Sequence, residues 1–112
     1  MVNRDKLIKY VFKVIGDDLL EKASKKDEAA NGVQILGGER VEKVALGVSL
    51  NSEFLEKVAD WGSNFCIFHH GFDPRTHKSR FPSFSQKRLK IIFVNNMTIA
   101  GFHFALDAHP AI

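Results

Sequence analysis

Asn64-Phe65-Cys66-Ile67-Phe68-His69-His70-Gly71 is the stretch that decides the fold, because an apolar run here leads directly into two adjacent histidines and a glycine. A short, continuous apolar run bounded by turn residues is typical of a strand buried on both faces. Upstream, residues 41–49 read as another strand, and residues 52–61 place apolar side chains at helical spacing between Asn51 and Gly62. Asparagine or serine favours a helix start and glycine a helix end. The three segments therefore predict a βαβ unit that delivers the histidines to the carboxyl end of a parallel strand, where open α/β sheets bind ligands.

The downstream sequence repeats this arrangement. Residues 83–95 give a rough helical face that ends at Asn95-Asn96, and residues 97–102 form a further apolar run. That run leads into the polar cluster from His103 to His109. We therefore expect a second group of histidines at the same edge of the sheet.

The N-terminal third supplies the remaining elements. Apolar residues recur at spacings of three and four from residue 4 to residue 20, which predicts an amphipathic helix. Residues 21–30 are polar and small; they favour a loop over an extension of the helix. Residues 33–36 and 41–49 read as strands that could pair as a hairpin. The expected fold is one α/β domain over residues 1–112, a small mixed sheet flanked by helices.

Composition sets limits on function. With 112 residues and 45% hydrophobic content the chain can bury a core, and no apolar run approaches the ~20 residues of a membrane span. A net charge of +3 is too small to require a nucleic-acid or membrane partner, although it is compatible with a phosphate-bearing ligand. The single cysteine, Cys66, cannot form an internal disulfide and reads as an inert core thiol, so we expect a reducing compartment, the cytoplasm, and no targeting segment.

The histidine pair alone leaves its chemistry open. Adjacent residues of a regular strand point to opposite faces, so His69 and His70 would not easily bind one ion together. They could serve two neighbouring ions, or the turn at Gly71 could bring them together. Alternatively, one histidine caps the strand and the other is solvated.

The second cluster favours a metal site. His103 and Asp107 are four positions apart, which is one turn if residues 104–109 are helical, so both can face the same point. A carboxylate can bridge two cations, and neutral imidazoles supply nitrogen ligands that zinc, iron, manganese or nickel accept.

Several motifs, taken together and in order, resemble the Nif-three-like dinuclear metal-centre family, whose members are often labelled GTP cyclohydrolase 1 type 2 homologs. The resemblance spans residues 28–110. It rests on Asn31-Gly32-Val33-Gln34, Val44-Ala45-Leu46-Gly47-Val48, His69-His70-Gly71, Lys87-Arg88-Leu89-Lys90 followed by Asn95-Asn96, and His103-Phe104-Ala105-Leu106-Asp107-Ala108-His109-Pro110.

The resemblance implies an α/β fold with two divalent metal ions at strand ends. By motif, His69, His70 and Asp107 would be ligands, with His103 a further ligand or a group that supports one. Metal-bound water would be the nucleophile of a hydrolase or cyclohydrolase acting on a nucleotide-type substrate. The family's ring-shaped hexamers imply a homo-oligomer, with no membrane partner.

Departures from the family pattern limit this expectation. Family members are generally about twice as long, and a histidine and a glutamate near their C-terminus complete the site. Gly47-Val48-Ser49 replaces a segment that usually ends in aspartate, and Phe72-Asp73-Pro74-Arg75 replaces the residues that often follow the HHG motif. We therefore expect a short or truncated form with an incomplete site. The alternative is a non-catalytic assembly module, and in both cases we expect self-association through surfaces left uncovered.

Basic residues after the histidine pair are the candidate substrate contacts. Arg75, His77, Arg80 and, further on, His109 could touch a substrate. With Lys78, Lys87, Arg88 and Lys90, the arginines form a basic region that is either a solvated face or a phosphate-binding rim. Such a rim would attract a nucleotide or, less specifically, nucleic acid.

Overall fold

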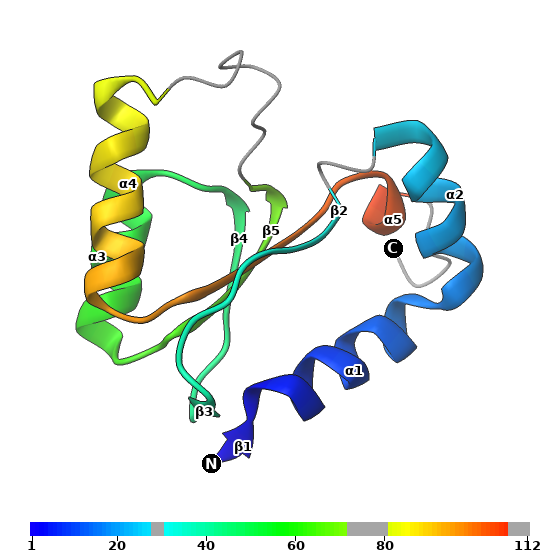
Figure 1. Ribbon diagram of the computed structural model, residues 1–112, viewed down its shortest axis with the longest axis horizontal. Helices are drawn as coiled ribbons and strands as arrows, with labels where there is room; N and C mark the ends of the chain where they lie inside the picture. Colours follow the sequence, from blue (N-terminus) through cyan, green and yellow to red (C-terminus); the bar gives the residue numbers. More distant parts are fainter. Residues whose placement is uncertain (28–30, 72–80, 108–112) are drawn as a thin grey trace.

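A four-stranded mixed sheet lies between two layers of helices in the computed structural model, which describes residues 1–27, 31–71 and 81–107 (Figure 1). In chain order the elements are β1 (Val2–Asn3), α1 (Arg4–Ile15), α2 (Asp17–Asp27), β2 (Asn31–Ile35), β3 (Arg40–Val41), β4 (Ala45–Ser49), α3 (Ser52–Trp61), β5 (Phe65–His70), α4 (Ser83–Val94), β6 (Thr98–Phe102) and α5 (Phe104–Asp107). The predicted α/β class and mixed sheet are confirmed. None of the helices in the described ranges combines the length and the hydropathy needed to cross a bilayer.

The sheet has the order β2-β6-β5-β4. β4 pairs parallel with β5, and β5 pairs parallel with β6, so the predicted βαβ unit is confirmed. The predicted hairpin of β2 with β4 is wrong, because these strands lie at opposite margins and β2 pairs antiparallel with β6. Val33 and Ile35 of β2 pack against different cores on the two faces of the sheet. Because β2 lies beside the central strand β6, Val33 and Ile35 can each reach one of the two cores.

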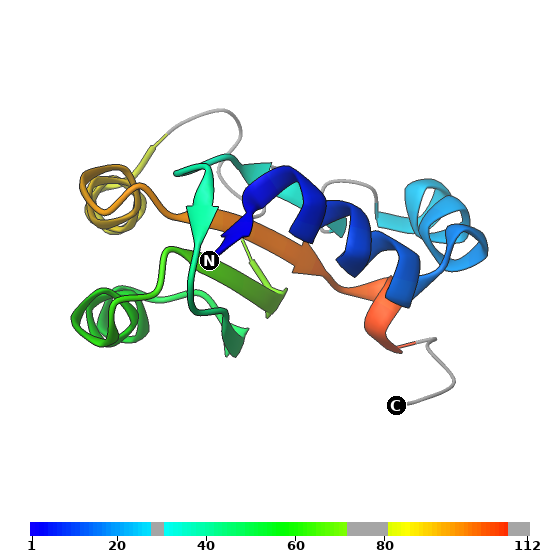
Figure 2. The same ribbon diagram turned by 90° about the horizontal axis from the view of Figure 1, so that it is seen from below.

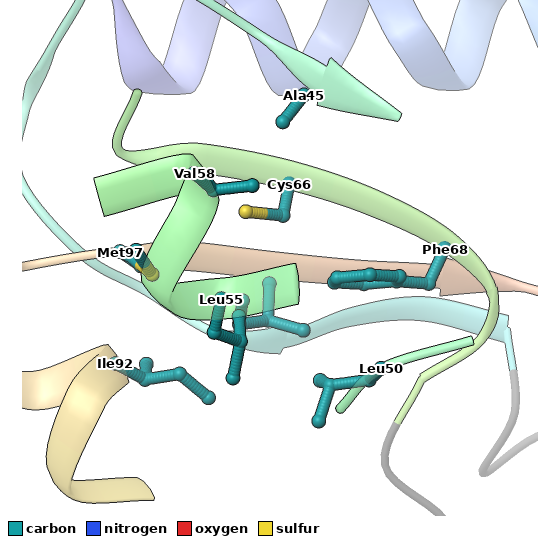
Figure 3. Packing of buried hydrophobic residues seen from close by; sticks show 9 residues of the cluster. Ala45, Leu50, Leu55, Val58, Cys66, Phe68, Ile92 and Met97 are labelled. Atoms are coloured by element: carbon teal, nitrogen blue, oxygen red, sulfur yellow. The ribbon is translucent and has the colours of Figure 1, made fainter. Parts of the chain in front are cut away.

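The first core lies between the sheet and helices α3 and α4 (Figure 3). It contains Ala45, Leu50, Leu55, Val58, Cys66, Phe68, Ile92, Met97 and Ile99. Helix α3 starts and ends where the sequence predicts: Asn51 Oδ1 accepts a hydrogen bond from the Phe54 amide over 2.8 Å, and Gly62 is left-handed with φ of 89°. This core fixes the helices that connect the parallel strands.

The second core lies on the opposite face, beneath α1 and α2. Gly16, with φ of 101°, separates these helices, so the single helix predicted over residues 4–20 is in fact two. The loop favoured for residues 21–30 is wrong as far as residue 27, because α2 continues to that point; residues 28–30 lie outside the described ranges. Leu19 and Leu20 pack against this core and Ala23 is completely buried in it. That narrow apolar stripe is enough to dock an otherwise polar helix.

A two-stranded antiparallel ribbon of β1 and β3 lies beside the main sheet and was not predicted: the single strand expected over residues 41–49 is wrong, because β3 ends at Val41 and β4 begins at Ala45 in the other sheet. Each strand of the ribbon has only two residues, too few to give a periodic signal in the sequence. Figure 2 shows α1 running from this ribbon across the sheet, and β6 leading directly into α5. The chain from β6 to α5 therefore brings His103 and Asp107 to the end of the sheet.

Candidate metal centre

The histidine pair occupies the last two positions of β5. The strand continues to His70, further than the predicted end near residue 68. On one side β4 accompanies it throughout, with Ser49 opposite His70; on the other, the β6 ladder ends at Phe68 and Gly101. The amide of Leu50 donates to the His70 carbonyl over 2.8 Å. The two histidines are therefore held by β4 after β6 has stopped pairing with β5, although β6 stays paired with β2 at Phe102.

His69, His70 and His103 form one cluster of imidazole rings. The ring centroids of His69 and His70 are 4.4 Å apart, those of His69 and His103 4.6 Å, and those of His70 and His103 4.9 Å. Strand alternation therefore does not keep His69 and His70 apart, because both rings lie beside His103 at the strand end. The open alternative of convergence at the turn before Gly71 describes the structure better.

Helix α5 brings His103 and Asp107 to this cluster. The Asp107 amide donates to the His103 carbonyl over 3.2 Å, which closes the expected helical turn. From the first residue of β2, Asn31 Oδ1 accepts a hydrogen bond from the Ala105 amide over 3.1 Å. Asn31 thus ties the short helix to the sheet. The sequence suggested a turn at Asn31-Gly32, which is wrong because both residues lie in β2, and it marked Asn31 only as part of the motif that carries the family resemblance.

Asp107 contacts His69 directly. The His69 Nε2–H donates to Asp107 Oδ1 over 2.9 Å. An ionised carboxylate only accepts hydrogen bonds, so the proton lies on Nε2 and the lone pair of neutral His69 lies on Nδ1. Such carboxylate–histidine pairs fix the tautomer and orientation of a metal-ligating imidazole. That Asp107 also ligates or bridges metal stays a prediction.

The cluster fits a divalent metal ion. One possible ligand atom from each of the three histidines can be chosen so that all lie within 4.8 Å of one another. Zinc binds imidazole nitrogen at ~2.0–2.1 Å in a tetrahedral arrangement, so the ligating nitrogens lie ~3.4 Å apart and the rings would have to move closer by at most ~1.4 Å. His69 and His103 are half-buried and His70 is exposed, so the site is open to ligand from solvent. Imidazole nitrogen suits zinc, iron and nickel alike, so the donor set does not select one metal.

The described residues do not test the predicted substrate contacts. Arg75, His77, Arg80 and His109 lie outside the described residues. Of the basic region, Lys87, Arg88 and Lys90 lie on α4, and the Arg88 guanidinium carbon is 5.1 Å from the centroid of the Phe84 ring. The phosphate-binding rim remains a prediction.

Cys66 is an inert core residue, as predicted. It is completely buried in the first core, and burial raises the pKa of its thiol to about 12. A thiol in this setting is not a nucleophile near neutral pH.

An apolar cavity of about 410 Å³, which the sequence did not suggest, adjoins the histidine cluster. Its lining residues come from α1 and from β4, β5 and β6: Tyr10, Val11, Val14, Ile15, Leu46, Gly47, Val48, Ile67, Phe68, His69 and Phe102. One feature of the sequence could have indicated the cavity. Leu46 and Val48 alternate along β4 and so place two apolar side chains on the face opposite Ala45 and Gly47.

Comparison with known proteins places these features in a family. The sequence model described as Duf34/NIF3 (NGG1p interacting factor 3) matches residues 7–111. The GTP cyclohydrolase 1 type 2 homolog of Escherichia coli (strain K12) is 31% identical over 96 residues, which is 86% of this chain and 39% of that protein.

Solved structures give the same result. The protein ybgI, of unknown function, superposes with a TM-score of 0.80 and 28% identity, covering 97% of this chain and 42% of that one. TTHA1606 from Thermus thermophilus superposes with a TM-score of 0.77 and 28% identity, covering 96% of this chain and 43% of that one. The chain thus spans less than half the length of the relatives that it matches.

Proposed function

The chain belongs to the Duf34/NIF3 family, and we propose that it binds a divalent metal ion through His69, His70 and His103 in support of hydrolytic chemistry. The observation that carries the proposal is the convergence of these imidazoles, two from the end of β5 and one from the start of α5. A divalent ion held there would act as a Lewis acid that polarises a carbonyl or phosphoryl oxygen.

Each residue of the centre has a distinct role in this proposal. His69 is the fixed ligand, because Asp107 holds its proton on Nε2 and leaves Nδ1 to bind metal. His103 is placed by α5, which Asn31 attaches to the sheet. His70 is the exposed ligand and closes the site on the solvent side. Asp107 is a positioning residue for His69, with direct ligation as the alternative role.

The reaction and substrate remain less specific. The name of the E. coli relative, GTP cyclohydrolase 1 type 2 homolog, supports a metal-dependent hydrolase or cyclohydrolase that acts on a nucleotide-type substrate. Three imidazoles and one carboxylate do not saturate two ions, so we propose one bound ion, or two bound incompletely, and low hydrolase activity. A neighbouring subunit or solvent would supply the remaining ligands.

Metal analysis of the purified protein tests the proposal. Protein stripped with chelator is dialysed against Co²⁺ or Zn²⁺ at equal concentrations, and bound metal is measured by elemental analysis. We expect about one ion per chain, with binding weakened in His69→Ala, His70→Ala and His103→Ala. Asp60→Ala, an exposed acidic position on α3, is the control and should bind like the wild type.

Two outcomes would contradict the proposal in different ways. No metal bound by the wild-type chain would rule out the metal centre. Two tightly held ions per chain, with nucleotide hydrolysis that is lost in His69→Ala, would show that the site is complete and the chain a competent hydrolase.

A non-catalytic assembly module is the second candidate, and the margin of the sheet supports it. β4 ends the sheet on one side, with one neighbouring strand in the described part of the chain. Its sequence, Ala45–Ser49, contains no charge and no proline, the usual devices that keep an edge strand from pairing with another chain. A metal-free protein that self-associates through this edge would favour the second candidate.

A further inference from the structure

We propose that the apolar cavity beside His69 binds the body of a small-molecule ligand: an aryl or branched-alkyl group with an oxygen-donor head at one end. The cavity would hold the body, and the head would reach the histidine cluster. The second part rests on the proposed metal centre, whereas the first depends only on the cavity itself.

The floor of the cavity is one face of the sheet margin. Leu46 pairs with Ile67 across β4 and β5, and the same register places Val48 beside His69, so these four side chains share a face. Over β6 and β2 this face is covered by the second core. Over β4 it is open: Leu46 is 72% exposed and Val48 70% exposed.

The wall of the cavity is one side of α1. Tyr10 and Val14 are four positions apart, so they lie on the same side of the helix; both line the cavity and both are exposed. Val11 and Ile15, on the adjacent side, join them in the lining and also pack into the second core. Because Val11 and Ile15 pack into the second core while Leu46 and Val48 stay exposed, the outer side of α1 and the open face of β4 form the two sides of a groove.

The chemistry of this groove selects an apolar ligand body. Its volume of about 410 Å³ lies within the ~300–1,000 Å³ typical of ligand pockets. The only polar side chains among its described lining residues are those of Tyr10 and His69, and none of these residues is acidic, lysine or arginine. A phosphate chain or a nucleobase edge placed here would lose hydration without gaining partners, which costs free energy. An aryl or branched-alkyl group has no comparable hydration to lose, and removing its apolar surface from water lowers the free energy of binding.

His69 connects the groove to the metal centre. It lines the cavity and is also a member of the three-histidine cluster. A ligand whose body lies on Leu46 and Val48 therefore has one end at His69. An oxygen donor at that end could bind the metal ion, which is why we infer a molecule that is apolar at one end and ligating at the other.

Two hydroxamates test the inference. Acetohydroxamate and benzohydroxamate carry the same chelating head but differ in the size of the apolar body. Their affinities are measured on Co²⁺-loaded protein by visible absorption, and the methyl resonances of Leu46, Val48 and Val14 are followed by NMR on both loaded and metal-free protein. We expect about tenfold tighter binding of benzohydroxamate, the gain from removing roughly 55 Å² more apolar surface from water. Methyl shifts should be confined to the groove.

Variants test whether the tighter binding of benzohydroxamate comes from contacts in the groove. Val48→Ser and, independently, Tyr10→Ser should reduce the preference for benzohydroxamate while leaving Co²⁺ binding unchanged. Val94→Ser, at an exposed position on α4 that does not line the cavity, should keep the preference. Two variants on opposite sides of the groove protect the test against misfolding of either one.

The outcomes separate this inference from the metal proposal. If the protein fails to bind Co²⁺ but benzohydroxamate still shifts the groove methyls of metal-free protein, the metal centre is wrong and the groove assignment holds. Equal affinity for the two hydroxamates, or shifts outside the groove, would overturn the inference. So would GTP shifting the same methyls in place of benzohydroxamate, or loss of benzohydroxamate binding as protein concentration rises, which would assign the groove to a second copy of the chain.

Discussion

His69 donates a hydrogen bond from Nε2 to Asp107 Oδ1 over 2.9 Å, although the two residues are 38 positions apart in the chain. The bond joins the end of β5 to α5, the two elements that carry the histidine cluster. Asp107 is 60% exposed at its side chain, so the bond contributes little to folding stability. Its consequence is instead the orientation and tautomer of His69.

Replacing Asp107 therefore tests how the metal centre is organised. Asp107→Ala should weaken metal binding about 10- to 100-fold, the usual effect of losing a group that orients a ligating histidine. Asp107→Asn should retain part of the affinity if Asp107 only positions His69, because the amide oxygen can still accept from Nε2–H. Competition for Zn²⁺ with a chromogenic chelator measures both, and Asp60→Ala is the matched control. Equal losses in the Ala and Asn variants would identify Asp107 as a direct ligand.

Gly37 and Gly71 are a matched pair of positions for testing how a tight backbone contact affects the free energy of unfolding. A Cβ on Gly37 would overlap the backbone carbonyl of Asn96, whereas a Cβ on Gly71 would meet only the flexible end of the Gln34 side chain. The Gly37 amide also donates to Thr98 Oγ1 over 2.8 Å, which fixes its position. Gly37→Ala should thus lower the free energy of unfolding by about 1–3 kcal/mol, and Gly71→Ala by clearly less. Urea denaturation followed by circular dichroism gives both values, and equal losses would contradict the packing argument.

The sequence predicted elements well where a local signal was strong. The helix between Asn51 and Gly62 and the apolar strand before His69 follow from capping and from a continuous hydrophobic run, which act over a few residues. Strand pairing is decided by which faces are buried in three dimensions, so the hairpin of β2 with β4 was wrong. The part of α2 from residue 21 to residue 27 was read as a loop because Ala23 is its one apolar residue known to be buried, and such a segment reads as polar until the surface that it covers is known.

The candidate site was predictable in its residues but not in its geometry. Two histidine-bearing segments after parallel strands indicated a cluster at one edge of the sheet. The convergence of His69 with His70 depends on β6 leaving β5 at Phe68, a feature of pairing with no local signal. The groove beside His69 depends on where α1 packs, which is equally a property of the assembled layers.

Burial of Cys66 leads to two predictions, one on alkylation of its thiol and one on the pH dependence of the free energy of unfolding. Because desolvation raises the pKa of its thiol from 9.0 to about 12, the thiol stays protonated in the folded protein near neutral pH. Alkylation by iodoacetamide at pH 8 should therefore be slow in native protein and fast in denaturant. Native labelling as fast as that of the unfolded chain would contradict the buried position.

The same shift makes stability depend on pH. The folded-state pKa lies above the unfolded value, so the contribution is complete below pH 9 and is lost as the pH rises toward 12, since only the unfolded chain releases the proton in that window. The loss approaches about 1.4 kcal/mol per pH unit. Subtracting the pH dependence of Cys66→Ala from that of the wild type isolates this contribution from other titrating groups. A difference that stays flat from pH 9 to 11 would contradict it.

The uncovered margin of the sheet gives the last prediction, that the protein self-associates in solution. β4 presents its backbone edge together with exposed Leu46 and Val48, and an apolar edge strand without charge or proline readily pairs with another chain. Leu46→Lys should shift the protein toward monomer, because a charged side chain on the edge opposes strand pairing. Val94→Lys introduces the same charge at an equally exposed valine on α4 and should leave the association unchanged. Sedimentation velocity over a range of concentrations measures the effect, and a wild-type protein that remains monomeric throughout would show that β4 does not mediate assembly.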